Sequence, residues 1–265
     1  MSSVILVTND DGVRSPGLAA LIRGVVGPGR RVVVAAPASD QSGTSAAVSP
    51  RPPDGVRIEP VTIAGLEEPG FEDLTAFAVD GPPALAVLGA RLGELGEVAA
   101  SASVIASGVN LGLNTGTSVL FSGTVGAALA GANLGLSGLA VSIDAFEPAH
   151  LATATTVAAA ALDWILQAPA GTVLNVNVPD LAVDRLTGIC DAPLATFGTV
   201  QVAVREALHE PFTAQFRVTQ PESDPGTDGA LLKEGWVTVT ALRGVGADPD
   251  VEVASFIERA VARAA

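Results

Sequence analysis

Short apolar runs alternate with segments of helical periodicity through the first 180 residues of this 265-residue chain. The apolar runs are rich in Val, Ile and Ala and carry almost no charge, which is typical of strands buried on both faces of a parallel sheet. They lie at 4–7, 31–36, 103–107, 139–142 and 172–178. Helices are predicted between them at 16–25, 83–92, 125–132 and 148–166. This alternation predicts an α/β fold with a doubly wound, parallel sheet.

Shorter strands are predicted at 56–63 and 76–79. Beyond about residue 181 the pattern changes to strand-like runs at 199–205, 212–219 and 236–242, followed by a closing helix at 249–264. We therefore predict a core over residues 1–180 and a strand-rich C-terminal region over residues 181–265. Exposed strand edges and apolar faces in such a region favour pairing with another chain.

The balance of charge restricts the partners. The chain has 28 Asp and Glu against 14 Lys and Arg, a net charge of -14. This charge repels polyanions, so we expect no nucleic-acid polymer and no acidic membrane as a partner. One cysteine, Cys190, and two histidines exclude an intrachain disulfide and the common zinc motifs, which fits a reducing cytoplasm.

An uncharged stretch at 101–143 raises the alternative of a membrane span. Glycines and asparagines recur through it, and they favour buried turns between strands and helices over a lipid-facing helix. The residues before the first strand have no basic segment of the kind that begins a secretory signal.

The first strand ends in the acidic loop Asn9-Asp10-Asp11-Gly12. Ser15 can cap the helix that follows, and Pro16 suits its first position. In open α/β sheets the ligand crevice lies outside the carboxyl ends of the strands, so Asp10 and Asp11 are candidate site residues. The alternative is a plain turn, because Asn, Asp and Gly are favoured in turns for backbone reasons.

Two more polar loops follow strands. The loop at 39–45 contains Ser42, and the Gly-, Asn- and Thr-rich loop at 108–117 contains Asn110 and Asn114. Ser122-Gly123-Thr124 then precedes a helix, and helix N-termini attract anions. A tightly packed Gly/Ala connection without a ligand is the alternative for this third stretch.

These loops are expected at one edge of the sheet. Two carboxylates, a hydroxyl and a side-chain amide form the all-oxygen set that Mg²⁺ or Mn²⁺ prefers. The helix N-terminus with Ser122 and Thr124 would attract the phosphate that the acidic chain otherwise repels. The pattern therefore predicts metal-dependent phosphoryl chemistry. A Rossmann dehydrogenase is discarded because no GxGxxG follows the first strand.

Six motifs resemble, in order and over nearly the whole chain, the SurE proteins, a stationary-phase survival family of nucleotidases. They are VTNDDG with SPG, QSG, SGVNLGLNTG, FSGTVGAA, LNVNVPD and GTD. The resemblance implies a Rossmann-like core, one divalent ion per subunit, and a homodimer or homotetramer assembled through C-terminal segments. Its implied activity is a 5′-nucleotidase for nucleoside 5′-monophosphates, with 3′-monophosphates and short polyphosphate as open alternatives.

The same resemblance implies roles for individual residues. Asp10 and Asp11 would be the catalytic residues, and both would also hold the metal. The implied metal ligands are Asp10, Asp11, Ser42 and Asn110, and the phosphate-binding set is Asn9, Gly43, Asn114, Ser122, Gly123 and Thr124.

The chain departs from the family pattern at 81–87. Pro82 and Leu85 stand where a threonine and an acid are usual, and Gly229 follows Gly226-Thr227-Asp228 in place of a larger residue. We expect these changes to alter the nucleotide preference. The competing hypothesis is a catalytically weak nucleotide-binding protein on the same scaffold.

Overall fold

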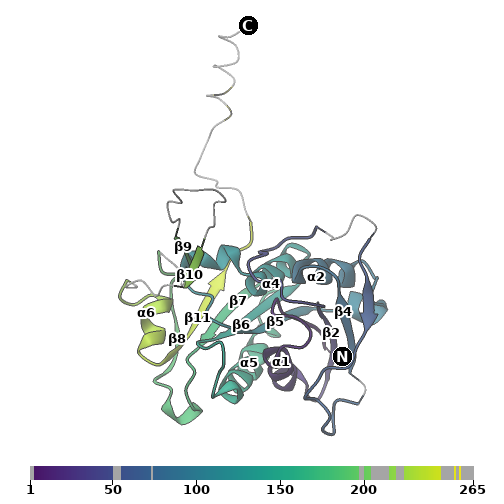
Figure 1. Ribbon diagram of the computed structural model, residues 1–265, viewed down its shortest axis with the longest axis horizontal. Helices are drawn as coiled ribbons and strands as arrows, with labels where there is room; N and C mark the ends of the chain where they lie inside the picture. The colour runs from purple at the N-terminus through teal and green to yellow at the C-terminus, as the bar shows by residue number, and fades with distance from the viewer. Residues whose placement is uncertain are drawn as a thin grey trace.

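The computed structural model describes residues 3–49, 55–72, 74–196, 200–203, 215–218 and 224–245, together with residues 254 and 257. It contains a nine-stranded sheet in the order β3-β4-β2-β1-β5-β6-β7-β11-β8 (Figure 1). The strands are β1 Ser3–Thr8, β2 Arg30–Pro37, β3 Ile58–Pro60, β4 Thr75–Val79, β5 Val104–Leu111, β6 Ser137–Ile143, β7 Val173–Val178, β8 Gly188–Asp191 and β11 Trp236–Leu242. Neighbours from β4 to β7 are parallel, so the α/β class is confirmed.

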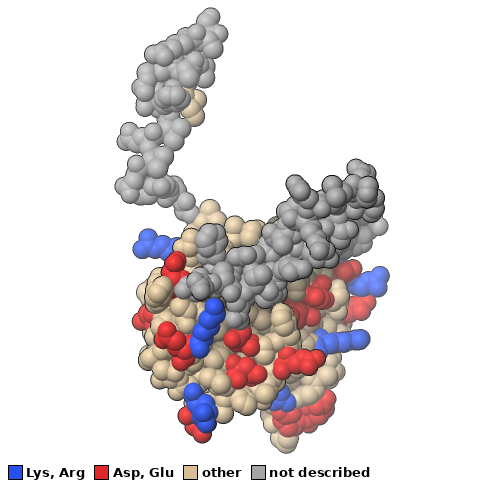
Figure 2. All heavy atoms as spheres, turned by 60° about the vertical axis from the view of Figure 1, so that its left-hand side comes forward, with Lys and Arg blue, Asp and Glu red and all other residues tan. Residues whose placement is uncertain are grey.

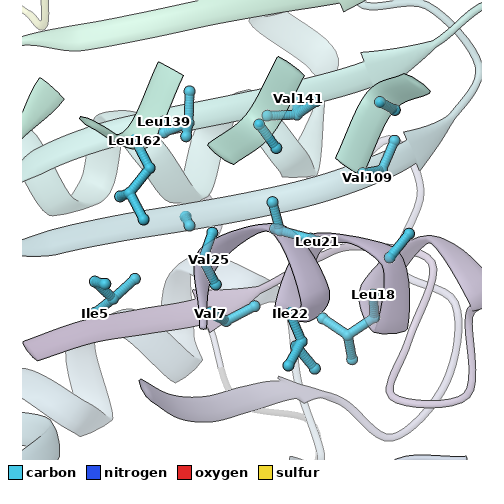
Figure 3. Close-up of a cluster of buried hydrophobic side chains, with 14 of the residues drawn as sticks. Ile5, Val7, Leu18, Leu21, Ile22, Val25, Val109, Leu139, Val141 and Leu162 are labelled. Atoms are coloured by element: carbon cyan, nitrogen blue, oxygen red, sulfur yellow. The ribbon is translucent and has the colours of Figure 1, made fainter. Parts of the chain in front are cut away.

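Helices cover both faces of the sheet. α1 Pro16–Val25 and α5 Leu151–Ile165 lie on one face, and α2 Pro83–Arg91 and α4 Gly123–Asn133 lie on the other (Figure 1). Figure 3 shows part of the core at α1, where Val25 of the helix lies beside Val7 of β1 and Leu21, Leu139 and Val141 belong to the same buried cluster. The shorter helical turns are α3 Glu97–Ala100, η1 Gly116–Phe121, η2 Val183–Arg185 and α6 Asp228–Lys233.

The predicted start of α1 is confirmed. Ser15 is its N-cap, its Oγ accepts a hydrogen bond from the N–H of Gly17 at 3.2 Å, and Pro16 occupies the first helical position. This cap fixes where the acidic loop after β1 ends.

Three predicted boundaries are wrong. β5 continues through Leu111, with an irregularity in its pairing to β6 between Ser107 and Asn110, so the predicted loop at 108–117 begins inside a strand. The strand predicted at 56–63 shrinks to Ile58–Pro60 and is antiparallel to β4. α5 begins at Leu151 and not at residue 148.

The leucines of α2 do not form its buried side. Leu85 and Leu88 are only partly buried and Leu92 is 69% exposed, whereas Ala86 and Ala90 belong to the buried cluster that includes residues of β1 and β2. Close helix–sheet contact favours small side chains, and the leucines instead line an apolar pocket of about 290 Å³. None of the candidate metal or phosphate residues is among the described residues that line it.

The C-terminal region contributes to the core sheet. The predicted strand at 236–242 is confirmed as β11, which pairs antiparallel with β7 and parallel with β8, so the sheet continues across residue 180. β9 Val200–Ala203 and β10 Gln215–Val218 form a separate antiparallel pair. Of the predicted helix at 249–264, residues 254 and 257 are helical, and the rest lies outside the described residues.

Among the described residues, no helix is long and apolar enough to span a bilayer. On the face shown in Figure 2, the described acidic side chains are spread among the basic ones. This face therefore presents no extended basic surface within the described part of the chain.

Candidate active site

The carboxyl ends of β1 and β5 meet the N-terminus of α4, and four candidate residues come together there. Asp10 and Asp11 follow β1, Asn110 lies near the end of β5, and Thr124 lies in the first turn of α4. The Thr124 hydroxyl donates a hydrogen bond to Asp10 Oδ1 and lies 3.4 Å from Asn110 Oδ1. One hydroxyl therefore connects both strand ends to the helix.

Asp10 is buried, with 4% of its surface exposed. Burial raises the pKa of Asp10 above its usual value, and hydrogen bonds from the Thr124 hydroxyl and from backbone N–H groups, including those of Thr124 and Gly123, oppose the rise. A carboxylate held at a helix N-terminus gains from the backbone dipoles. Asp10 is thus an oriented acceptor in a site largely shielded from water.

Gly123 allows this close approach. A Cβ atom at position 123 would lie 2.7 Å from both Cβ and Oδ2 of Asp10, nearer than unbonded carbon and oxygen atoms can pack. The backbone of α4 can therefore reach the carboxylate only because residue 123 has no side chain.

Asp11 is partly buried beside Asp10. Its Oδ2 accepts a hydrogen bond from the N–H of Leu111 at 3.3 Å, which connects it to the end of β5. Burial raises the pKa of Asp11 to about 6, and the neighbouring carboxylates of Asp10 and Asp40 add to the rise. The carboxylates of Asp10 and Asp40 thus disfavour the charged form of Asp11, and a bound cation would stabilise it.

Asn110 presents its side-chain oxygen to the site. Its Nδ2 donates a hydrogen bond to the carbonyl of Gly112 at 2.6 Å, and this bond orients the amide with Oδ1 toward Thr124. An amide oxygen beside a buried carboxylate suits a hard cation.

The loop after β2 reaches the site through its backbone. The N–H of Gln41 donates a hydrogen bond to the carbonyl of Asp10 at 2.7 Å, but the hydroxyl and N–H of Ser42 both bond to Asp40 Oδ1, at 2.6 and 2.8 Å. Ser42 is exposed in this arrangement, and Gly43 has a positive φ of 77° with no atom near its would-be Cβ. The structure places both residues at the rim.

Asn9 is fully buried and shapes the acidic loop. Its Nδ2 donates a hydrogen bond to the carbonyl of Gly12 at 3.0 Å, while its Oδ1 has no hydrogen-bond partner among the described residues. A buried oxygen without a donor is costly, and a cation or a water molecule would satisfy it.

The donors fit a hard divalent cation. The carboxylates of Asp10 and Asp11 and the amide oxygen of Asn110 are all oxygen ligands, and the described residues contain no group of three His, Cys, Asp or Glu side chains that could hold a metal alone. Neutral oxygens and water would have to complete the coordination, as Mg²⁺ tolerates.

Ser122 is the N-cap of α4. Its Oγ accepts a hydrogen bond from the N–H of Val125 at 3.0 Å, so α4 begins at Gly123, two residues before the predicted start, and the hydroxyl that was predicted to bind phosphate also caps the helix. The N–H groups of Gly123 and Thr124, the other donors of this first turn, are directed at the Asp10 carboxylate, and such groups bind anions.

Asn114 makes its contacts away from Asp10. Its Nδ2 donates a hydrogen bond to Ser142 Oγ at 2.8 Å, its N–H donates to Asn177 Oδ1 at 2.9 Å, and its carbonyl accepts from Asn175 and Asn177 at 2.8 and 2.9 Å. The described contacts thus anchor Asn114 to β6 and β7, and they do not bring it to the Thr124 hydroxyl.

Asp228 was not assigned a role from the sequence. It is fully buried, and its carboxylate accepts hydrogen bonds from the N–H groups of Gly116, Ala195 and Gly229 at 2.8–2.9 Å. The C-terminal region is thereby attached to the loop that leads into η1 and α4. The GTD motif was the signal in the sequence that could have identified Asp228.

The family model for Survival protein SurE matches residues 5–201. Among curated proteins, the chain is 35% identical over 249 residues to the 5′-nucleotidase SurE of Nitratidesulfovibrio vulgaris (strain DSM 19637 / Miyazaki F), covering 91% of this chain and 86% of that protein. It is 35% identical over 247 residues to the 5′-nucleotidase SurE of Alkalilimnicola ehrlichii (strain ATCC BAA-1101 / DSM 17681 / MLHE-1), covering 90% and 88%.

Among solved structures, the SurE protein from Aquifex aeolicus matches with a TM-score of 0.69 and 25% identity, over 98% of this chain and 99% of that one. Together with the family match over residues 5–201, these similarities show that the chain belongs to the SurE family.

Proposed function

We propose that this protein is a divalent-metal-dependent phosphomonoesterase that hydrolyses nucleoside 5′-monophosphates. The observation that carries the proposal is the Thr124 hydroxyl, which lies between Asp10 and Asn110 in the first turn of α4. This arrangement puts oxygen donors for a cation directly beside backbone N–H groups that suit a phosphate. The name 5′-nucleotidase SurE, carried by the relatives, supports the same activity.

Asp10, Asp11 and Asn110 would hold one Mg²⁺ or Mn²⁺ ion, with the rim residue Ser42 able to join them if its hydroxyl turns from Asp40. When bound, such an ion polarises a phosphoryl oxygen and lowers the pKa of a bound water. The N-terminus of α4 would hold the phosphate opposite the carboxylates.

Asp11 is the better candidate to orient the attacking water. Asp10 is committed to Thr124 and the α4 N-terminus, whereas Asp11 is less buried and accepts one long hydrogen bond, from Leu111. Its second oxygen can therefore accept a hydrogen bond from water. A covalent phosphoenzyme at Asp10 is less favoured, since that carboxylate is already occupied.

The test is release of phosphate from AMP and p-nitrophenyl phosphate, with Mg²⁺, Mn²⁺ or EDTA, by wild-type protein and by the Asp10→Asn and Asp11→Asn variants. We expect metal-dependent turnover in the wild type, loss of turnover and of metal binding in both variants, and unchanged circular dichroism spectra. Metal-dependent AMP binding by a wild type without turnover would instead support the nucleotide-binding alternative.

We further propose that the chain assembles as a homodimer or homotetramer through its C-terminal region. The β9–β10 pair stands outside the nine-stranded sheet, and an isolated two-stranded pair is at best marginally stable in water. Sedimentation at micromolar concentration tests this, and a monomeric full-length chain would contradict it.

A further inference from the structure

Phe146 is an exposed aromatic residue at the edge of the candidate active site. It lies in the connection between β6 and α5, and 68% of its surface is exposed. The N–H groups of Gly112 and Ala145 both donate hydrogen bonds to the carbonyl of Ile143, at 3.0 and 2.8 Å. These bonds hold the connection that carries Phe146 against the end of β5, where Asn110 lies.

The Phe146 ring packs over a glycine next to the metal donors. A Cβ atom at Gly112 would lie 3.3 Å from Cε1 of Phe146 and 3.9 Å from Nδ2 of Asn110, so the ring edge and the amide lie against the same glycine. Gly112 has a φ of +129°, which other residues rarely adopt. The phenyl ring is therefore held close to Asn110, and it belongs to none of the buried clusters found among the described residues.

Single exposed apolar residues are common, so exposure alone carries no function. The position of Phe146 is the additional fact. A nucleotide whose phosphate lies at the α4 N-terminus must place its sugar and base outside the metal donors, and an aromatic ring beside Asn110 offers a flat apolar surface there. Bases stack on such rings with little dependence on sequence.

The charged residues around Phe146 also favour a base over a phosphate at this position. Asp144 and Glu147 lie within two residues of Phe146, Asp180 lies near Asp144, and Lys233 balances part of their charge. The net acidic charge disfavours a phosphate here more than a neutral base. The phosphate is favoured at the helix N-terminus and the base at the ring, which would orient a nucleotide in one direction across the site.

We propose that Phe146 is a specificity-determining residue on which the nucleobase of a nucleoside monophosphate stacks. The inference rests on the proposed phosphomonoesterase activity and adds that the enzyme selects nucleotides over phosphate esters without a base. Purines and pyrimidines would both be accepted, because stacking uses the face of the base.

The test compares AMP and CMP with ribose 5-phosphate, which has the same phosphate and sugar but no base. In Phe146→Ala we expect kcat/KM for AMP to fall about tenfold, mainly through KM, while that for ribose 5-phosphate is unchanged. Phe146→Trp should retain the preference for AMP, and Phe146→Leu should lose it. Inhibition by adenosine should weaken in Phe146→Ala, and inhibition by inorganic phosphate should not.

Phe121→Ala is the matched control, because Phe121 is also exposed, at 57%, and lies in η1 beside α4. We expect it to leave the ratio of AMP to ribose 5-phosphate unchanged. Equal losses on both substrates in Phe146→Ala, no loss on either, or loss of the AMP preference in Phe121→Ala would overturn the inference. Wild-type turnover of ribose 5-phosphate tests the underlying activity separately, since that substrate does not use the ring.

Discussion

The carboxylate of Asp228 accepts the N–H of Gly116 at 2.8 Å across 112 residues of sequence. Its other oxygen accepts the N–H groups of Ala195 and Gly229. Gly116 begins η1, which leads to the Ser122 cap and the first turn of α4. A buried acid in the C-terminal region therefore fixes the path of the chain into the end of the site where we propose that phosphate binds.

We predict that Asp228→Asn destabilises the fold by about 1–3 kcal/mol, because the amide group points an N–H at a backbone donor in a buried position. The free energy of unfolding from urea titration measures this change. We also expect weaker inhibition by inorganic phosphate, with Mn²⁺ binding altered less, because Gly116 lies on the route to α4 and not among the metal donors.

Asp224→Asn is the matched control for Asp228→Asn. Asp224 is an exposed acid in the same segment, and it accepts the Thr196 hydroxyl at 3.1 Å. Its replacement should change stability little, because exposed polar contacts contribute little. Equal effects of the two substitutions would contradict a special role for Asp228.

The second prediction concerns Gly123→Ala. The added methyl would lie 2.7 Å from Asp10, so either the carboxylate or the start of α4 must move. A displacement of about 1 Å at a reacting centre can reduce the rate about 100-fold. Gly89→Ala is the control, because Gly89 lies in α2 with no atom near its would-be Cβ, and it should retain full activity.

Buried strands and caps could be predicted because their signals are local. The run at 4–7 has no plausible state other than a buried strand, and Ser15-Pro16 marks a helix start by its own chemistry. The gathering of Asp10, Asn110 and Thr124 followed from one topological rule, that the carboxyl ends of parallel strands share an edge.

The other features of the site depend on contacts between residues that are distant in sequence. The partners of Asp228 lie at residues 116, 195 and 229, and those of Asn114 lie on β6 and β7, so no local pattern identifies them. In α2 the residues that pack against β1 and β2 include Ala86, Val87 and Ala90, and the spacing of the leucines does not identify that side of the helix.

The third prediction is that Asn177→Ala destabilises the protein more than Asn175→Ala. Asn177 both accepts the N–H and donates to the carbonyl of Asn114, whereas Asn175 donates to the carbonyl only. Removing Asn177 leaves a buried N–H without its partner, at a cost of about 1–3 kcal/mol. Urea unfolding of both variants measures the difference, and equal losses would show that the two asparagines are equivalent.

The fourth prediction concerns Leu85, where the family pattern has an acid. Leu85 lines the apolar pocket beside α2, and no candidate metal or phosphate residue shares that pocket. Leu85→Asp should therefore reduce stability by placing a charge against apolar neighbours, and should leave the ratio of AMP to p-nitrophenyl phosphate hydrolysis unchanged. A changed ratio would support the expectation drawn from the sequence, that this departure alters the nucleotide preference.

The final prediction separates the two possible roles of Thr124. The sequence assigned its hydroxyl to the phosphate, but in the structure the hydroxyl bonds to Asp10 and lies near Asn110, both candidate metal ligands. Loss of a group that orients metal ligands typically costs 10- to 100-fold in metal affinity or activity. We therefore expect Thr124→Val to weaken Mn²⁺ binding in calorimetry by about tenfold.

Thr124→Ser provides the control, because it keeps the hydroxyl and should retain Mn²⁺ affinity. The backbone N–H of residue 124 remains in both variants, so inhibition by inorganic phosphate should change less than metal binding does. If Thr124→Val weakened inhibition by phosphate and left the Mn²⁺ affinity unchanged, the Thr124 hydroxyl would be assigned to phosphate binding, as the sequence predicted. In that case the Asp10 carboxylate would keep its position through the backbone N–H groups of Gly123 and Thr124 alone.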